Sequence, residues 1–457
     1  MPRMLLPLCL ALGACMSTAP SEMPTRASTE AAPLLPPMKT FSGPRPDTPR
    51  AANADIVRDF LDLAFRLESG RELPVLTRFE GPISLRVTGK APISLGIDLD
   101  HLLTRLRREA GIEIHRTRSK SASITIEAVS HAQIRKHLPQ AACFVVPNVS
   151  SLKEYASARR APRTDWTRLA KREKLAIFVP ADAPPQELRD CLHEELAQAL
   201  GPLNDLYRLS DSVFNDDNVH TVLTGYDMLI LRAFYSPQLR SGMTRGEVAA
   251  RLPGILAALN PAGQHRAPRY LPKTPRSWID AIQAALGPGS NPTTRRAAAQ
   301  RAVNIARSEG WTDLRRAFSH YALGRLTQNY DANIALAHFS AAQKYYGQAP
   351  DTRLHASQVA QQLAAYAISE GRGQAALGII DPHLNVAAQH ENAALLSTLL
   401  LLRAEALDLL GRTTEARMVR LDSLGWARYG FGADWAVRAK LKEITALSPL
   451  KRSTGQI

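Results

Sequence analysis

The feature that most constrains this chain is a change of pattern at the triplet Gly287-Pro288-Gly289. Before the triplet, apolar residues at helical spacing alternate with short runs of period two, so helices and strands are mixed. After it the chain is rich in Ala and Leu, keeps the helical spacing and has no convincing strand. The sequence therefore predicts an α+β domain over residues 54–287 and an all-α domain over residues 293–450.

Periodicity and capping residues predict the elements of the first domain. Asp55 is a suitable N-cap for a helix that Gly70 ends, and Gly111 closes a second helix. Helices are expected over residues 55–68, 97–110 and 184–200, and strands over residues 83–88, 112–114, 124–126, 143–146 and 175–179. The 457 residues supply enough apolar material for the cores of two domains.

The helical domain repeats a helix-turn-helix rhythm. Gly324 with Phe339, then Gly371, then Gly411 mark three stretches in which a small residue or a turn glycine is followed by Ala-rich helix. These stretches resemble degenerate tetratricopeptide repeats, although the spacing departs from the 34-residue period of that family. A simple α-helical bundle is the alternative. Because stacked helix pairs serve more often for docking than for chemistry, a protein partner is expected at this domain.

The N-terminus has the form of an export signal. Arg3 is followed by the apolar stretch of residues 4–12 and by Gly13-Ala14-Cys15. Leu12 to Cys15 resembles the lipobox of bacterial lipoproteins, which implies a signal peptide over residues 1–14, acylation of Cys15 and membrane lipid as a partner. In that family an Asp after the Cys retains the protein in the inner membrane, and Met16 and Ser17 are not Asp. The resemblance implies a periplasm-facing protein anchored to the outer membrane; an ordinary signal peptide is the alternative.

Residues 15–53 are rich in Pro, Ala, Ser and Thr and are predicted to form a disordered tether. With Cys9 removed and Cys15 acylated, only Cys143 and Cys191 are left. Two remaining thiols in an oxidising compartment predict a disulfide, with two separately buried thiols as the alternative.

Composition narrows the classes of function. No run of 18 apolar residues occurs, which argues against a multi-span membrane protein. The 57 Lys and Arg residues exceed the 42 Asp and Glu residues, for a net charge of +15. These cations are dispersed in small groups, so we expect either an ordinary solvated surface or attraction to an anionic envelope polymer, and no nucleic acid partner.

The most specific stretch is Glu194-Glu195-Leu196-Ala197-Gln198-Ala199-Leu200-Gly201-Pro202-Leu203-Asn204-Asp205. The motif Ser212-Val213-Phe214-Asn215-Asp216-Asp217 and the residues Thr224, Asp227 and Tyr235 follow it. Together they resemble a proteobacterial family of predicted lipoproteins with a domain of unknown function, marked by E-E-x-x-Q-A-L-G-x-x-N-D. The resemblance covers roughly residues 55–250.

That signature in turn resembles a degenerate metzincin protease motif, H-E-x-x-H-x-x-G-x-x-H, which implies a zincin-like fold. Glu194, Gln198 and Asn204 then occupy the zinc-ligand positions, and Glu195 occupies the position of the general base. Residues i and i+4 share one face of a helix. Gly201 is expected to end the helix in the left-handed conformation, so that Asn204 faces back towards it.

The donor atoms at these positions are poorly suited to zinc. Zinc prefers imidazole and thiolate ligands, whereas Glu194, Gln198 and Asn204 offer one carboxylate and two neutral amides. His193 is one position out of phase and has no partner ligand four residues later. We therefore expect an inactive zincin-like domain without metal or cofactor. The alternatives are a hard-cation or unusual catalytic site, or a solvated helix without relation to zincins.

These observations favour a membrane-anchored binding or scaffold protein with a helical docking domain over an enzyme. The rival hypothesis is a metal-dependent hydrolase of peptides or envelope polymer, with Glu195 as the general base. The oxygen-rich run Asn215-Asp216-Asp217-Asn218 could hold Ca²⁺, but an ordinary polar turn is favoured because the EF-hand spacing is missing.

Overall fold

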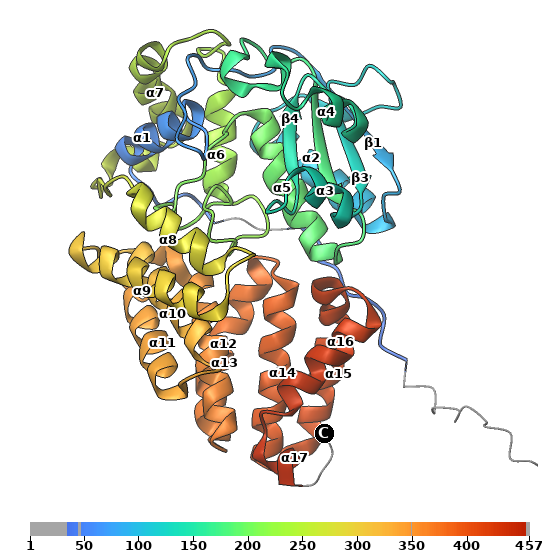
Figure 1. Cartoon of the computed structure of the whole chain (residues 1–457), viewed down its shortest axis with the longest axis vertical. Coiled ribbons are helices and arrows are strands. Elements are labelled where there is room, and N and C mark those ends of the chain that lie inside the picture. Colours follow the sequence, from blue (N-terminus) through green and yellow to red (C-terminus); the bar gives the residue numbers. More distant parts are fainter. Residues whose placement is uncertain (1–33, 44–46, 349, 454–457) are drawn as a thin grey trace, which may run out of the picture. The chain divides into compact units, whose positions relative to one another are not determined.

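A computed structural model describes residues 34–43, 47–348 and 350–453 of the chain (Figure 1). The chain divides into two compact units, residues 1–35 and residues 36–457, and the following description concerns the second. The expected signal peptide, Cys15 and the tether up to residue 33 lie outside the described residues. Among the described residues, no helix has both the length and the apolar character needed to cross a membrane.

The first region is built on a mixed five-stranded sheet. Its strands are β1 (Ile83–Gly89), β2 (Ile114–Arg116), β3 (Ile124–Val129), β4 (Phe144–Pro147) and β5 (Leu175–Pro180). The strand order is β2-β1-β3-β5-β4; β4 is antiparallel to β5 and the other neighbours are parallel. Four of the predicted strands are confirmed, whereas the strand predicted over residues 112–114 is displaced and lies at residues 114–116. β4 forms one edge of the sheet, beside β5.

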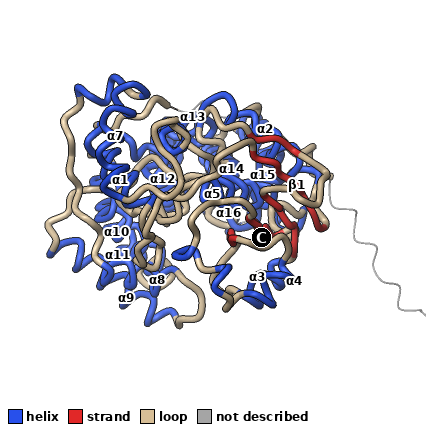
Figure 2. The backbone as a smooth tube through the Cα atoms, turned by 90° about the horizontal axis from the view of Figure 1, so that it is seen from above, coloured by secondary structure: helices blue, strands red, loops and turns tan. Residues whose placement is uncertain are grey.

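Helices cover both faces of this sheet (Figures 1 and 2). The helices of the region are α1 (Asn53–Ala64), α2 (Ile93–Glu109), α3 (His131–His137), α4 (Leu152–Ala158), α5 (Pro185–Leu200), α6 (Gly225–Phe234) and α7 (Arg245–Leu259). Ile177 on β5 belongs to the large core shared with α2 and α5, whereas its neighbour Phe178 packs with α3 and α4 on the other face. Successive side chains of a strand alternate between faces, so β5 is apolar throughout because both faces are covered.

The second region consists of stacked helix pairs. Its helices are α8 (Arg276–Leu286), α9 (Pro292–Ser308), α10 (Leu314–Thr327), α11 (Ala332–Tyr346), α12 (Arg353–Ser369), α13 (Gly373–Gln389), α14 (Ala393–Leu409), α15 (Thr413–Phe431), α16 (Asp434–Thr445) and α17 (Pro449–Ser453). Gly324 lies where α10 crosses α11, and a Cβ atom there would come within 2.8 Å of the Phe339 ring. Gly411, with φ +74°, makes the turn between α14 and α15. The predicted helical domain is confirmed as an all-helical region.

The helical packing begins earlier than the sequence suggests. α8, which lies before the Gly287-Pro288-Gly289 triplet, packs through Trp278 and Ile282 against Ala302 and Ala306 of α9. The Trp278 indole also donates to Ser319 Oγ of α10, 2.9 Å away. The triplet is therefore the loop inside a helix pair, and Trp278 of α8 also packs on the Tyr207 ring of the first region, with centroids 4.9 Å apart.

Part of the expected tether is packed rather than free. The Lys39 N–H donates to the Gly425 carbonyl of α15 at 3.0 Å, and the Phe41 ring stacks on Trp426 with centroids 4.5 Å apart. Arg428 donates to the Pro36 carbonyl at 2.9 Å. Residues 36–41 thus form an ordered strap on α15, because Phe41 finds an apolar surface that lies almost four hundred residues away in the sequence.

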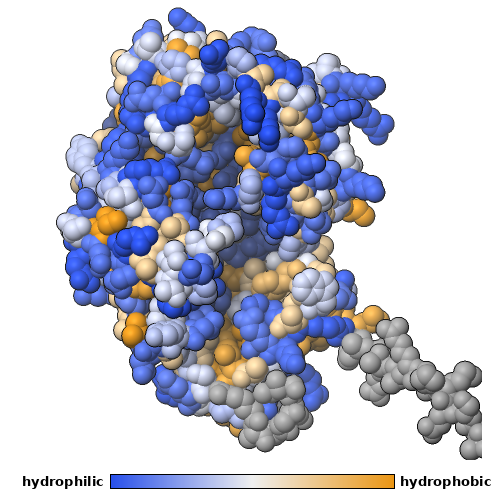
Figure 3. All heavy atoms as spheres, viewed as in Figure 1, coloured by the Kyte–Doolittle hydropathy of each residue, from blue (hydrophilic) through white to orange (hydrophobic). Residues whose placement is uncertain are grey.

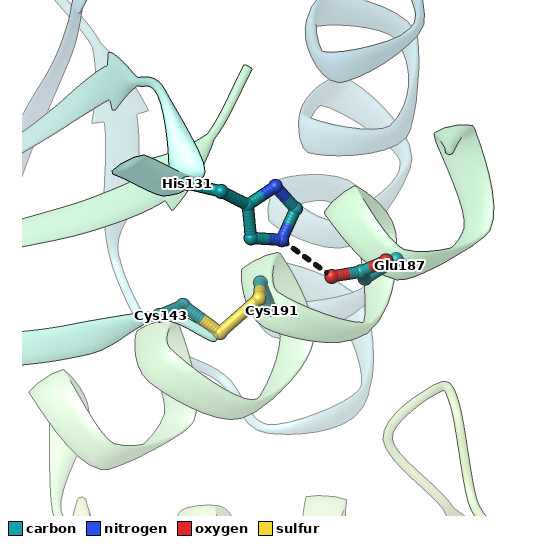
Figure 4. The surroundings of a disulfide bond; sticks show 4 residues. All are labelled: His131, Cys143, Glu187 and Cys191. Carbon is teal, nitrogen blue, oxygen red and sulfur yellow. Dashed lines mark hydrogen bonds and ion pairs between the residues drawn. A yellow bond between two sulfur atoms is a disulfide. The ribbon is translucent and has the colours of Figure 1, made fainter. Parts of the chain in front are cut away.

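The predicted disulfide between Cys143 and Cys191 is confirmed. It joins the segment just before β4 to the middle of α5 (Figure 4). Close to it, His131 Nε2 lies 2.9 Å from Glu187 Oε1, a second link between α5 and the sheet side of the domain. The edge strand and α5 are therefore held together covalently.

Replacement of both cysteines by serine is expected to lower the free energy of unfolding by about 4 kcal/mol, because the disulfide closes a loop of 48 residues in the unfolded chain. Urea unfolding with and without reductant measures this loss. Reductant should leave the double variant unchanged. Equal stability of the wild type and the double variant would contradict the prediction.

Candidate functional site

One face of α5 is structural. Leu192, Leu196, Ala199 and Leu200 are all fully buried in the core shared with the sheet and with α6. Their three- and four-residue spacing predicts this face, and the structure confirms it. The remaining motif side chains must therefore point elsewhere.

The C-terminal end of α5 is fixed by buried donors. Arg172, which is only 2% exposed, donates to the carbonyls of Gln198 and Gly201, and the Tyr235 hydroxyl donates to the Leu200 carbonyl at 3.0 Å. Burial lowers the pKa of Arg172 to about 10, so the guanidinium stays charged at neutral pH. A cation at this position satisfies carbonyls that have no partner within the helix and complements the negative end of its dipole.

The expected left-handed conformation of Gly201 is wrong. Its φ is −170°, which is extended backbone. Glycine is required there for space, since a Cβ atom would lie 2.8 Å from the Phe234 ring. The close packing of α6 on this turn, rather than a positive φ, explains the residue.

A cavity of about 560 Å³ lies beside α5 and the edge strand β4. Its polar walls carry Glu68, Glu194, Glu195, Gln198, Asp205, Asp216 and Asn218, and its apolar walls include Leu67, Leu138, Phe144, Trp166 and Leu203. We call it the carboxyl cavity. A second cavity of about 500 Å³ adjoins it and shares Leu67, Glu68, Ser69 and Asp205. Segments from five parts of the first region thus meet around one group of acids.

The acids of the carboxyl cavity hold their protons strongly. Burial, followed by the carboxylates of Glu68 and Asp216, raises the pKa of Glu194 to about 8. Burial and the neighbouring Glu194 raise the pKa of Glu195 well above its ordinary value, and burial with Glu68 and Glu194 does the same for Asp205. Removing a charge from water and placing like charges together both favour the neutral acid.

Two carboxyl oxygens in this cavity lack a partner. Glu195, which is 5% exposed, leaves Oε2 without a hydrogen bond, and Asp205 leaves Oδ1 without one. Asp216, in contrast, accepts a 2.6 Å hydrogen bond from the Tyr207 hydroxyl. Buried polar atoms are nearly always satisfied, so unsatisfied acceptors at a cavity wall indicate a place where a donor from outside can bind.

The positions expected from the protease-like motif are brought together only in part. Glu194, Glu195 and Gln198 line the carboxyl cavity. Asn204 does not line it, because its amide donates to the Asp62 carbonyl at 3.0 Å, on the side of α1. The next residue, Asp205, stands at the cavity wall in its place.

The other motif residues are structural. Asp227 accepts hydrogen bonds from Ser212 Oγ at 2.5 Å and from the backbone of Val213 at 3.1 Å, and it forms a capping box with Thr224 at the start of α6. Phe214 is fully buried in the core. The segment that follows α5 is therefore held against α6 by one buried carboxyl group.

His193 is a satisfied core residue. Its Nδ1 accepts a 3.0 Å hydrogen bond from the Leu223 N–H, so the ring is the neutral Nε2–H tautomer. Burial and the nearby Arg105 lower its pKa well below the ordinary value. His193 has a packing role and faces away from the carboxyl cavity, whose lining residues do not include it.

The residues of the carboxyl cavity do not fit zinc. They offer carboxyl groups and the amides of Gln140, Gln198 and Asn218, whereas a zinc site is built mainly from imidazole and thiolate. Across the described ranges, no group of three or more His, Cys, Asp or Glu side chains is arranged to hold a metal ion. In the run Asn215–Asn218, Asp217 accepts from the Val219 N–H and lies 2.8 Å from His355 Nε2, which is the pattern of a polar turn rather than of a calcium loop.

Residues 53–254 match a family described as a protein of unknown function (DUF2927). The match agrees in extent with the resemblance found in the sequence, and it includes every residue that lines the carboxyl cavity. The helices from α8 onward lie outside it. No curated protein and no solved structure matches the chain.

Sequence reasoning assigned no role to several residues of the site. Asp205 and Asp216 belong to the N-D and N-D-D parts of the motif but were not assigned a position in the site. Trp166 and Glu68 lie outside every motif and reach the cavity only through the fold. For Asp205 and Asp216, their position in a polar motif is a sequence signal that could have identified them. For Trp166 and Glu68 the sequence holds no such signal.

The Glu194→Gln variant is expected to flatten the pH dependence of stability. Because the folded state holds the Glu194 proton up to about pH 8 and the unfolded state releases it near 4.5, this group's contribution is full below pH 4.5 and is lost as pH rises through 8. The wild type should therefore lose on the order of a few kcal/mol between pH 5.5 and 8.5 that the variant keeps.

Thermal or urea unfolding at both pH values measures this difference. Glu113→Gln, which replaces an exposed acid just before β2 and outside the carboxyl cavity, is the control and should follow the wild type. Parallel pH profiles for the wild type and Glu194→Gln would show that Glu194 titrates as an ordinary surface acid.

Proposed function

We propose that this protein is a lipid-anchored envelope protein whose DUF2927 domain binds a cationic group in the carboxyl cavity. The observation that carries the proposal is the pair of unpartnered buried oxygens, Glu195 Oε2 and Asp205 Oδ1, in a cavity with three further carboxyl groups. No cationic side chain lines this cavity. A ligand must therefore supply the positive charge that the site lacks.

The chemistry of the ligand follows from the state of the acids. A neutral carboxyl group becomes charged when a cation approaches, because the opposite charge lowers its pKa again. Ammonium and guanidinium groups carry only donors, and hydrogen bonds from a cation to a carboxylate are about twice as strong as neutral ones. An amine or guanidinium, as on a basic peptide segment, fits both requirements, and the apolar walls at Leu138 and Trp166 suit its aliphatic stem.

The same observations support a zincin-like domain that has lost its metal chemistry. The motif helix α5 lies between the sheet and a cavity bounded by the edge strand β4, and Glu194 and Gln198 project from one side of it. The third ligand position, Asn204, is turned away. A binding module built on this architecture requires the acids and the cavity but no metal.

Other parts of the chain support a cellular location and partners for the domain. The Leu12-Gly13-Ala14-Cys15 sequence supports an acyl anchor that keeps the protein at the outer membrane, facing the periplasm. The stacked helix pairs support a tetratricopeptide-like docking surface for a protein partner. The net charge of +15 supports attraction to anionic envelope polymer.

Tetralysine is the probe for the cavity. Calorimetric titration of the full mature chain is expected to show binding that releases protons and strengthens between pH 6 and pH 8, because the acids ionise when the cation binds. Glu195→Gln should weaken binding at least tenfold, whereas Glu113→Gln, which removes an exposed charge outside the cavity, should leave it unchanged. Titration in two buffers of different ionisation enthalpy counts the released protons.

Equal weakening by both variants would mean that tetralysine binds a general acidic surface, and the proposal would fail. The alternative function, hydrolysis of peptide or envelope polymer, is favoured by one observation: Glu195 stands unpartnered at the cavity wall. Burial and the neighbouring Glu194 raise its pKa, which favours the role of a proton donor over that of a base. Stoichiometric bound metal with peptide cleavage that Glu195→Gln abolishes would establish that function instead.

The anchor is tested separately. Cys15→Ser is expected to abolish incorporation of a fatty-acid probe and to leave an uncleaved or miscleaved precursor, because the thiol is the acylated group in lipoproteins. Metabolic labelling followed by electrophoresis measures this. Labelling of the variant at the wild-type level would show that Cys15 is not the acylation site.

A further inference from the structure

The strap of residues 36–41 marks the place where the folded unit meets the chain that leads to Cys15. Pro36 is the first residue of this unit, and its carbonyl accepts from Arg428 in the last turns of α15. Arg428 also lies 3.6 Å from Asp434, the first residue of α16. Lys39 forms an ion pair with Asp422 on the same side of α15. The anchor-bearing chain therefore begins on α15, next to the start of α16.

Exposed large apolar side chains occur on the strap and on the two helices that hold it. Met418 and Leu421, one helical turn apart on α15, are 68% and 59% exposed, and Leu421 directly precedes Asp422. Trp435, directly after Asp434, is 75% exposed, and Met38 within the strap is 40% exposed. We call these four residues the strap face. On the side of the molecule in view, apolar surface is visible over α14, α15 and α16 (Figure 3).

The surroundings of the strap face are basic. Residues 413–453 contain eight Lys and Arg residues against four Asp and Glu residues, a net charge of +4, and two of these cations, Arg420 and Lys451, pair with Glu405 and Asp408 of α14. Exposed apolar side chains beside cations are typical of surfaces that insert into the headgroup region of an anionic bilayer. A tryptophan has an apolar ring with one polar N–H and is well suited to that boundary.

The length of the chain between Cys15 and the strap decides how close an acylated protein stays to the membrane. Cys15 and Pro36 are 21 residues apart in the sequence. A chain of that length spans at most about 75 Å, which sets the greatest distance between Cys15 and the strap. An acyl group at Cys15 therefore keeps the strap face at a high local concentration next to the lipid, where even weak contacts are occupied.

We infer that the strap face docks on the membrane surface and fixes the orientation of the anchored protein. Met418, Leu421, Trp435 and Met38 insert among the lipid headgroups, and the basic residues of α15 and α16 face anionic phosphates. The inference rests on the proposed function in one respect: the acyl anchor at Cys15 keeps the strap face close to the membrane. Docking itself is a property of the folded unit.

The test uses the mature chain of residues 16–457, which has no acyl group, so that its outcome is independent of acylation at Cys15. The probe is a vesicle of phosphatidylethanolamine and phosphatidylglycerol in a 3:1 ratio. The wild type is expected to co-sediment with these vesicles, and brominated lipid is expected to quench Trp435 emission. The triple variant Met418→Gln/Leu421→Gln/Trp435→Gln should lower vesicle binding at least tenfold.

The matched control is Ile93→Gln/Ile97→Gln, which removes an exposed apolar pair, 86% and 48% exposed, from α2 in the first region. This variant should bind vesicles like the wild type. Because all substituted side chains are exposed, thermal melts of the variants should coincide. Failure of the wild type to bind, or equal binding by the triple variant, would overturn the inference.

A second copy of the chain is the competing occupant of the strap face. Light scattering distinguishes it: self-association of the wild type that the triple variant abolishes, without vesicle binding, would make the face a contact between copies. Loss of fatty-acid labelling in Cys15→Ser with intact vesicle binding of the mature chain would support both proposals independently. Absence of labelling in the wild type would contradict the anchor alone.

Discussion

The position of α5 is the constraint on which the site depends, and charged groups hold both of its ends. At the C-terminal end Arg172 donates to the carbonyls of Gln198 and Gly201. At the N-terminal end Arg189 forms a 2.9 Å ion pair with Glu391, which lies between α13 and α14. Breaking a buried pair by removing one partner leaves a charge without compensation and costs about 3–5 kcal/mol. The disulfide at Cys191 lies between these two ends of α5. The three contacts together fix the rotation of the helix about its axis, so the carboxyl groups of Glu194 and Glu195 stay directed into the cavity.

The unpaired acids of the carboxyl cavity are not explained by a shortage of cations in the fold. On α1, Asp59 is buried and Asp62 is partly buried, yet Arg208 lies 2.7 Å and 2.8 Å from them and the Tyr226 hydroxyl donates to Asp59. At this network the chain pairs its acids with a cation. Around Glu195 and Asp205 it leaves them without a cationic partner, at a cost in stability that grows as these acids ionise. Buried groups that lower the stability of the fold are concentrated at functional sites. For this reason the carboxyl cavity, rather than the Arg208 network, is the candidate site.

Periodicity predicted the elements that position the site, but contacts between distant segments decided its composition. The strands and α5 were predictable because both faces of the sheet and one face of the helix require apolar residues at fixed spacing. Asn204 was expected at the site and Asp205 occupies it, because the turn after α5 is set by the Phe234 ring above Gly201, a contact 33 residues away. Trp166 and Glu68 enter the cavity through loops whose paths no local pattern encodes. Composition predicts a free tether over residues 36–41. The segment is instead held on α15, because Phe41 packs on Trp426, and no local pattern reveals so distant a partner.

The helical region supports the site, because the loop after α5 contacts both the carboxyl cavity and the helices. Asp216 lies at the cavity wall, whereas the adjacent Asp217 lies 2.8 Å from the buried His355 on α12. His355 is in turn one of three histidines in contact, with His220 of the same loop 5.6 Å away and His390 at the end of α13 5.4 Å from His220. Within this polar turn, one loop therefore directs one acid to the carboxyl cavity and the next to the helices. The Gln186 amide adds a second connection, since it bonds both Asn392 and the Ala394 N–H at the start of α14. The cavity is thus built by the first region and held in shape by the second, and a DUF2927 domain without the helices would expose the buried faces of Gln186, Arg189 and Asp217. For this reason the two regions form one folded unit, in which the contacts of the helical region also support the walls of the carboxyl cavity.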